Sequence, residues 1–189
     1  MALGLPQLHE RALASTRAYV ANVKSDQLSD PTPCEDYDVR ALLNHVISGN
    51  LWVAPLVEGQ TIEQVGDRFD GDVVGDDPLA AYDASAKSAA AAFNGPGAME
   101  APVAVSYGPV PGEIYAGHRL IDVVIHGWDL AKATGQDTTL DPELVTACRQ
   151  VVEPQAELLA GSGMFGTTQD VPSSAGAQTK LLAMLGRTG

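Results

Sequence analysis

Three side chains of the kind that bind metals recur at a fixed spacing near the middle of the chain. His118, Asp122 and His126 follow one another at intervals of four residues. Asp129 comes three residues after His126. Such spacing places side chains on one stripe of an α-helix. Imidazole and carboxylate groups are nitrogen and oxygen ligands of divalent transition metals, so the stripe predicts a candidate metal site.

The rest of this helical segment is apolar, which indicates that the helix is central. The intervening residues are Leu120, Ile121, Val123, Val124 and Ile125. A buried carboxylate or imidazole is costly unless it is paired, and one divalent cation would compensate several such groups at once. Metal sites inside helical bundles combine ligands from facing helices. We therefore expect His45, in a second apolar helical pattern, to complete a metal site with Asp122 and His126.

Other roles for these residues stay open. In a metal-free arrangement, Asp122 would instead accept a hydrogen bond from a histidine and fix its tautomer. His118, at the start of its helix, is either a further ligand or a solvent-facing residue. Asp129 is expected to orient His126 or a backbone donor, because metal-bound imidazoles usually donate their other N–H to a carboxylate or carbonyl. His9 is expected at the surface.

Two cysteines and two aromatic residues accompany these motifs. Cys34 and Cys148 are too few and too far apart for a disulfide framework or a thiolate zinc site. Both are expected to be reduced and buried, although Cys34 lies in a loop next to the candidate site and a reactive role is open. Trp128 is expected to pack in the core. Tyr37 either packs over its loop or offers its hydroxyl to a ligand.

The elements that must position these residues are predicted to be helices. Apolar residues spaced by three and four indicate helices over residues 5–23, 38–55, 78–93 and 113–134, with a fifth that begins at Asp141-Pro142. Asp77 before Pro78 is a typical helix start.

The remaining segments are predicted to form a long loop, a small hairpin and a last helical turn. Residues 58–77, rich in Gly and Asp, are predicted to be a long loop, and residues 99–113 a short extended excursion or hairpin. A last helical turn is predicted at 180–185. The predicted fold is all-α: a four-helix bundle with a short additional helix and a small β excursion, in one domain over residues 1–189.

Charge and hydropathy exclude several classes of partner. The net charge is −13, with 24 acidic and 11 basic residues, so nucleic acid and anionic membrane surfaces would be repelled. An anionic small substrate would need a local cation, which a bound metal could supply. No apolar run approaches the ~20 residues of a membrane-spanning helix. The first residues do not read as a secretory signal, so a cytoplasmic location is expected.

Three segments resemble one known family. They are 32–46 (TPCEDYDVRALLNHV), 122–135 (DVVIHGWDLAKATG) and the tail from Phe165-Gly166 to Arg187. They resemble the N-terminal domain of mycothiol-dependent maleylpyruvate isomerase, within the DinB-like, YfiT-like group of four-helix bundles. The resemblance spans nearly the whole chain. Two positions depart from the pattern: Asp122 stands where the isomerase has Glu, and Tyr37 stands where Trp is usual.

The resemblance implies a ligand set and a chemistry. It maps the metal ligands onto His45, Asp122 and His126, with zinc as the first expectation and nickel or iron as alternatives. Members related to the isomerase use the metal to bind and activate a low-molecular-weight thiol such as mycothiol. The expected partners are therefore a small-molecule thiol and an electrophilic substrate, and a homodimer is compatible with the sequence.

Three functional hypotheses follow. The first is a thiol-dependent transferase or isomerase-like enzyme, in which Asp129 or Tyr37 assists proton transfer. The second is a non-catalytic module that binds a metal or a small ligand. The third is a non-haem iron protein, because two histidines and one carboxylate also describe that ligand triad.

Overall fold

Four long helices form the bundle that positions the candidate site. The computed structural model describes residues 3–35, 37–156 and 166–188. The four helices are α1 (Leu5–Val20), α2 (Val39–Val57), α4 (Pro78–Phe93) and α5 (Gly112–Ala133). The carboxylates of Asp38 and Asp77 accept hydrogen bonds from backbone N–H groups in the first turns of α2 and α4. Each such cap contributes about 1 kcal/mol to helix stability.

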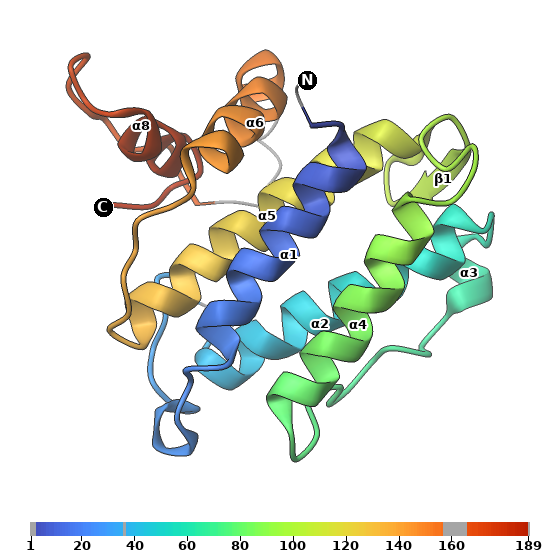
Figure 1. Cartoon of the computed structure of the whole chain (residues 1–189), viewed down its shortest axis with the longest axis horizontal. Coiled ribbons are helices and arrows are strands. Elements are labelled where there is room, and N and C mark those ends of the chain that lie inside the picture. The colour runs from blue at the N-terminus through green and yellow to red at the C-terminus, as the bar shows by residue number, and fades with distance from the viewer. Residues whose placement is uncertain (1–2, 36, 157–165, 189) are drawn as a thin grey trace.

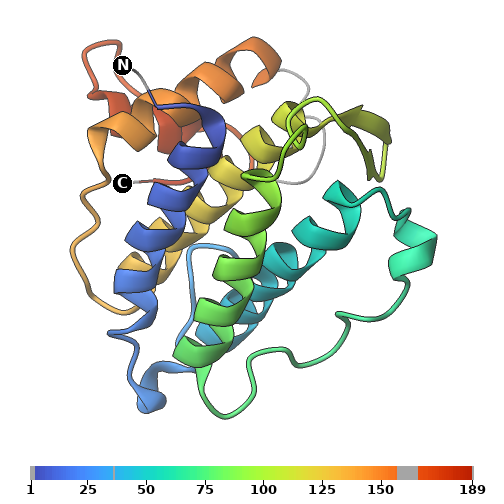
Figure 2. The ribbon, with the colours of Figure 1, turned by 45° about the vertical axis from the view of Figure 1, so that its right-hand side comes forward.

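The helices pack so that α5 lies inside the molecule. α1 packs against α4 and α5, and α2 packs against the same two helices (Figure 1). α6 (Pro142–Val152) covers another side of α5, and α8 (Ala177–Met184) packs on α6. Figure 2 shows the same helices after a turn of 45° about the vertical axis. Most side chains of α5, including Trp128, are buried, which confirms the prediction of a central helix and of a core tryptophan.

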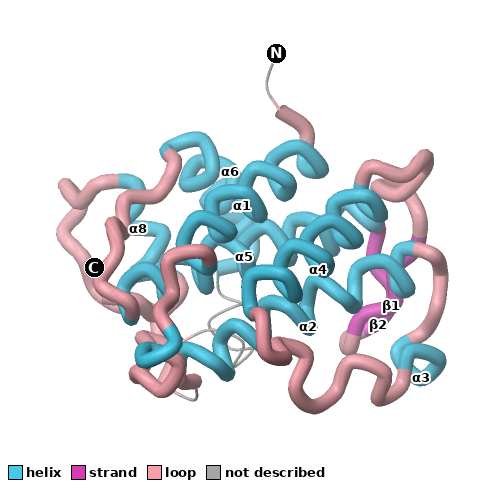
Figure 3. Tube along the Cα trace, turned by 60° about the horizontal axis from the view of Figure 1, so that its bottom comes forward, coloured by secondary structure: helices cyan, strands magenta, loops and turns pink. Residues whose placement is uncertain are grey.

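A small hairpin lies at one end of the bundle. β1 (Pro102–Val105) and β2 (Gly108–Pro111) pair in antiparallel fashion, with Val103 opposite Val110. The hairpin leads directly into α5 and lies at the same end of the molecule as α3 (Figure 3). Val103 is fully buried and anchors the hairpin on the bundle. The predicted β excursion and the all-α fold class are thus confirmed.

Two segments differ from the sequence-based expectation. The first helix ends at Val20 rather than near residue 23. The loop predicted over 58–77 contains the short helix α3 (Ile62–Val65), which Thr61 and Gln64 start with reciprocal side-chain to backbone hydrogen bonds. Short 3-10 helices at Ser25–Gln27 and Glu153–Gln155 complete the described elements.

The prediction for His9 was wrong. Its side chain is fully buried, edge-on to the ring of Phe93 at a centroid distance of 4.9 Å. Phe165, which belongs to the C-terminal part of the resemblance, lies outside the described residues. Among the described helices, none is both long and apolar enough to cross a bilayer. The single-domain organisation stays a prediction.

Candidate metal centre

The three expected ligands converge between two helices. α2 supplies His45, and α5 supplies Asp122 and His126 one turn apart. One ligand atom from each of the three lies within 4.8 Å of the other two. The Oδ1 atom of Asp122 is 3.3 Å from Nε2 of His45 and 3.6 Å from Nε2 of His126. This set of two imidazoles and one carboxylate fits a divalent ion such as Zn²⁺.

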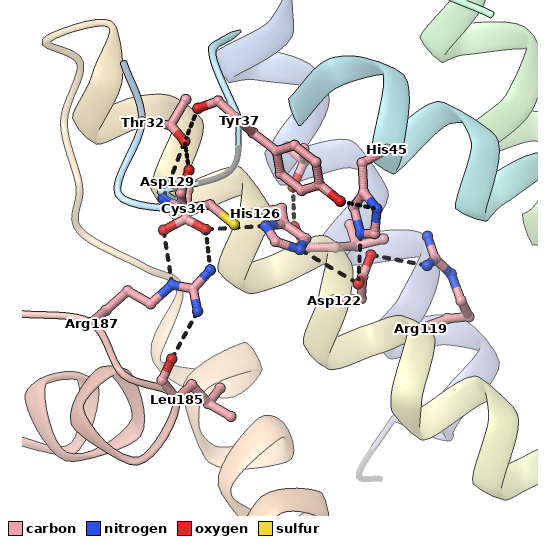
Figure 4. A network of polar contacts seen from close by, with 12 residues as sticks. Thr32, Cys34, Tyr37, His45, Arg119, Asp122, His126, Asp129, Leu185 and Arg187 are labelled. Atoms are coloured by element: carbon pink, nitrogen blue, oxygen red, sulfur yellow. Dashed lines mark hydrogen bonds and ion pairs between the residues drawn. The ribbon is translucent and has the colours of Figure 1, made fainter. Parts of the chain in front are cut away.

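Both imidazoles turn the same nitrogen toward this centre (Figure 4). The Nδ1 atom of His126 lies 3.0 Å from Oδ2 of Asp129, and that of His45 lies 3.5 Å from the hydroxyl of Tyr37. The Tyr37 ring also stacks on His45, at 5.4 Å between centroids and 29° between planes. Outer contacts of this kind fix the tautomer and orientation of metal-binding histidines. Both Nε2 atoms face Oδ1 of Asp122.

A buried arginine holds Asp129 in contact with His126. Asp129 has no solvent exposure, and Arg187 contacts it at 3.1 Å (Nε to Oδ1) and 2.7 Å (Nη2 to Oδ2). Burial alone would raise the pKa of the Asp129 carboxyl. Hydrogen bonds from His126 and Arg187 outweigh burial, so the pKa lies below its ordinary value. Asp129 is therefore an ionised acceptor for the Nδ1–H of His126.

A second buried arginine pairs with Asp122 itself. Arg119 donates from Nη1 to Oδ2 of Asp122 at 2.9 Å, and from Nη2 to Oδ1 of Asn50 at 3.2 Å. Burial would raise the pKa of the Asp122 carboxyl. The Arg119 guanidinium and the two histidines together hold the pKa well below its usual range. Asp122 thus uses one oxygen for the arginine and presents the other to the imidazoles.

The centre opens onto a cavity of about 820 Å³. Its wall includes His45 and Asp122, and its other polar or aromatic lining residues are Cys34, Glu35, Tyr37, Ser106, Tyr107, Tyr115, His118, Arg119, Thr167, Gln169 and Arg187. A cavity of this size is in the range of small-molecule sites. The centre therefore has room beside it for a ligand that reaches Asp122.

The remaining candidates divide between cavity and core. His118 lines the cavity with Nδ1 3.1 Å from the hydroxyl of Tyr107, and it does not join the three-residue group. Cys34 is half-buried in the same wall. Cys148 is buried in the core, where burial raises the pKa of its thiol to about 12. Asp129 is not part of the cavity wall.

Sequence reasoning missed both arginines. Arg119 stood three residues before Asp122 in an otherwise apolar stretch, and that spacing on a helix was a usable signal. Arg187 lies 58 residues from Asp129, so no local pattern links the two residues. Its contact depends on the path of the C-terminal segment after α8.

The fold and the site together define a class: helical-bundle proteins with a candidate His/Asp/His metal centre at a cavity. The comparison with known families specifies it further. The chain belongs to the mycothiol maleylpyruvate isomerase N-terminal domain family, whose family model matches residues 9–131. The matched range contains all three candidate ligands.

Relatives of full length occur in Mycobacterium tuberculosis. Two proteins described as uncharacterized, from strains CDC 1551 and H37Rv, are each 39% identical over 189 residues. Each alignment covers 95% of this chain and 96% of the relative. No solved structure shows a significant match to this chain.

Proposed function

We propose that this protein binds one divalent metal ion, most simply zinc, through His45, Asp122 and His126, and uses it in thiol-dependent chemistry. The observation that carries the proposal is the position of Asp122 Oδ1, which lies 3.3 Å and 3.6 Å from the two Nε2 atoms. Three protein ligands at the edge of a cavity resemble catalytic rather than structural zinc sites, which have no open position.

The chemistry would be activation of a small-molecule thiol. A divalent metal lowers the pKa of a thiol that coordinates it and holds the resulting thiolate beside an electrophile. The family to which the chain belongs carries mycothiol in its name, which supports a thiol partner. The cavity beside Asp122 is large enough for part of a thiol and an electrophilic substrate.

The chain's own residues have distinct proposed roles. His45, Asp122 and His126 hold the ion, and Asp129 orients His126 from beneath rather than exchanging protons with a substrate, because it does not line the cavity. Tyr37 does line the cavity, with its hydroxyl 3.5 Å from His45, and is the proposed proton-transfer group. A transferase or isomerase-like enzyme in the cytoplasm is the function we favour.

Two alternative functions use the same three residues as metal ligands but differ in what the bound metal does. A non-catalytic module would bind a metal or a thiol without turnover. A non-haem iron protein would use the same three ligands with iron. Turnover of the bound thiol distinguishes the enzyme from the module.

The test uses cobalt as a visible substitute for zinc. A thiolate bound to cobalt(II) gives a charge-transfer band that nitrogen and oxygen ligands do not give. We expect titration of the cobalt-loaded protein with mycothiol, or a simpler thiol, to produce this band, and the His126→Ala variant to lack it. If no thiol changes the spectrum of the loaded protein, thiol chemistry is wrong for this site.

A second step separates enzyme from module. Where the band appears, conjugation of the thiol to chlorodinitrobenzene or a bimane reagent is compared with and without protein. Acceleration that is lost in His126→Ala supports the transferase. A band without acceleration supports the binding module. The Tyr37→Phe variant should keep the band and slow the conjugation.

A further inference from the structure

The buried arginines among the described residues both pair with carboxylates at the candidate metal centre: Arg119 with the candidate ligand Asp122, and Arg187 with Asp129 next to His126. Arg119 and Arg187 retain only 8% and 6% of their exposure, and they pair with Asp122 and Asp129. By contrast, Arg17 and Arg40 form ion pairs with half-exposed side chains at the surface. A buried cation is costly to desolvate even when paired. Two buried arginines at one site therefore carry a desolvation cost that their role at the site must offset.

These arginines cancel the carboxylate charge at the site. Asp122 and Asp129 contribute two negative charges, and Arg119 and Arg187 contribute two positive charges. With neutral imidazoles, the described groups that hold or orient the ligands sum to zero. The acidic group of the cavity wall besides Asp122 is Glu35, which is exposed. A divalent ion here would have no net protein charge to balance it.

Arg119 is built into this position by neighbouring residues of α2. A Cβ atom on Gly49 would overlap the Arg119 guanidinium and lie 2.7 Å from its Cζ atom, so the guanidinium occupies the space that a side chain would fill. Asn50, the next residue, accepts a hydrogen bond from Nη2. Glycine inside a helix costs about 1 kcal/mol relative to alanine. Gly49 thus lowers the stability of α2 but leaves space for the Arg119 guanidinium beside Asp122.

The paired groups at the centre are neutral as a set, whereas the whole chain is strongly acidic. The protein carries a net charge of −13, which repels anions in general. At the centre, however, Asp122 shares its charge with Arg119, which also lines the cavity. Without Arg119, Asp122 would balance half the charge of a divalent ion. With Arg119 present, an anion entering the cavity would meet a site of higher positive potential.

We propose that Arg119 is a specificity-determining residue that makes the loaded centre select an anionic ligand over a neutral one, at the expense of metal affinity. The inference rests on the proposed metal-binding function and assigns the class of ligand for that same site. A thiol would therefore be taken as its anion. An electrophile that carries an anionic group near its reacting atom would be favoured for the same reason.

The test measures two affinities that should move in opposite directions. In the Arg119→Gln variant, the charge is lost but an amide donor remains beside Asp122. We expect its affinity for Co²⁺, measured by competition with a chelator, to rise by about tenfold or more. The reason is that no guanidinium cation remains beside Asp122 to offset its attraction for the ion. The affinity of the cobalt-loaded variant for azide, followed by its visible spectrum, should fall by about tenfold. Imidazole, a neutral probe, should bind both proteins about equally.

Further variants guard against a change in folding. Gly49→Ala pushes the guanidinium away without removing it and should shift both affinities in the same directions as Arg119→Gln. Arg40→Met removes an exposed charge from the same helix, α2, and should change neither affinity. Far-ultraviolet circular dichroism checks that each variant keeps the helical fold.

The results that would overturn this inference differ from the result that would overturn the proposed metal binding. If Arg119 only orients Asp122, metal affinity and azide affinity will fall together in Arg119→Gln, and the inference is wrong. Unchanged azide affinity in both Arg119→Gln and Gly49→Ala would also overturn it. If the wild-type protein takes up no cobalt at all, the proposed function fails first and this inference fails with it.

Discussion

Arg187 contacts Asp129 through two nitrogen–oxygen pairs, at 3.1 Å and 2.7 Å, and Asp129 in turn contacts Nδ1 of His126. The pair joins the C-terminal segment to the last turns of α5 across 58 residues of sequence. Both side chains are buried, so each neutralises a charge that would otherwise be buried without an opposite charge beside it. The C-terminal segment thus takes part in the orientation of a candidate metal ligand.

Loss of Arg187 should therefore destabilise the fold as well as the site. The Arg187→Met variant removes the guanidinium that neutralises the buried Asp129 carboxylate, a change that typically costs about 3–5 kcal/mol of unfolding free energy. Urea unfolding of metal-free protein measures this cost. Arg17→Met, which breaks an exposed pair with Asp83, is the matched control and should lose far less stability. Equal losses in the two variants would contradict this role of the buried pair.

The site was predictable from sequence where its contacts are local. Asp122, His126 and Asp129 share one helical face, so their spacing alone placed them together. His45 required the further step that two apolar helices face each other, and the structure brings it to the same point. Arg187 could not be predicted, because its position depends on how the chain after α8 returns to α5.

His9 shows where residue type misled the prediction. Leu5, His9, Ala12 and Thr16 are spaced by four, three and four residues, which is one helical stripe. Polar residues are usually exposed, and that tendency favoured a surface position. The stripe gave the correct answer, since His9, Ala12 and Thr16 are all buried. Periodicity was the stronger signal at this position.

Burial of His9 should make stability depend on pH. Desolvation, with a further effect of Arg119, lowers the pKa of His9 from 6.5 to about 3. Between these values the unfolded chain binds a proton at His9 and the folded protein does not, so stability falls as pH falls. His9 alone should reduce the unfolding free energy by about 2 kcal/mol from about pH 8 to about pH 5.

The His9→Leu variant isolates this effect. Groups other than His9 contribute equally to both proteins, so the difference in unfolding free energy between variant and wild type reports His9. Urea unfolding in the presence of a chelator should show the variant gaining on the wild type as the pH is lowered. Parallel pH profiles for the two proteins would mean that His9 takes up its proton in the folded state.

Close contact between α1 and α5 beside His126 depends on Gly127. A Cβ atom at this position would overlap Oγ1 of Thr16, which donates a hydrogen bond to the carbonyl of Val123 at 3.0 Å. Gly127→Ala should therefore destabilise the protein by about 1–3 kcal/mol, as overpacking of a core does. Adding Thr16→Ala removes the overlap, so the double variant should be more stable than the additive expectation. Strict additivity would show that the two residues do not clash.

Metal content per chain tests the central claim most directly. Protein purified without added metal or chelator should contain close to one transition-metal ion per chain by elemental analysis, or should take up one equivalent of zinc after reconstitution. His45→Ala and His126→Ala should each abolish this occupancy while the circular dichroism spectrum stays helical. Asp129→Asn, which keeps all three ligands, should weaken zinc binding by about 10- to 100-fold. Wild-type protein that is metal-free and cannot be loaded with zinc, nickel or iron would contradict the account.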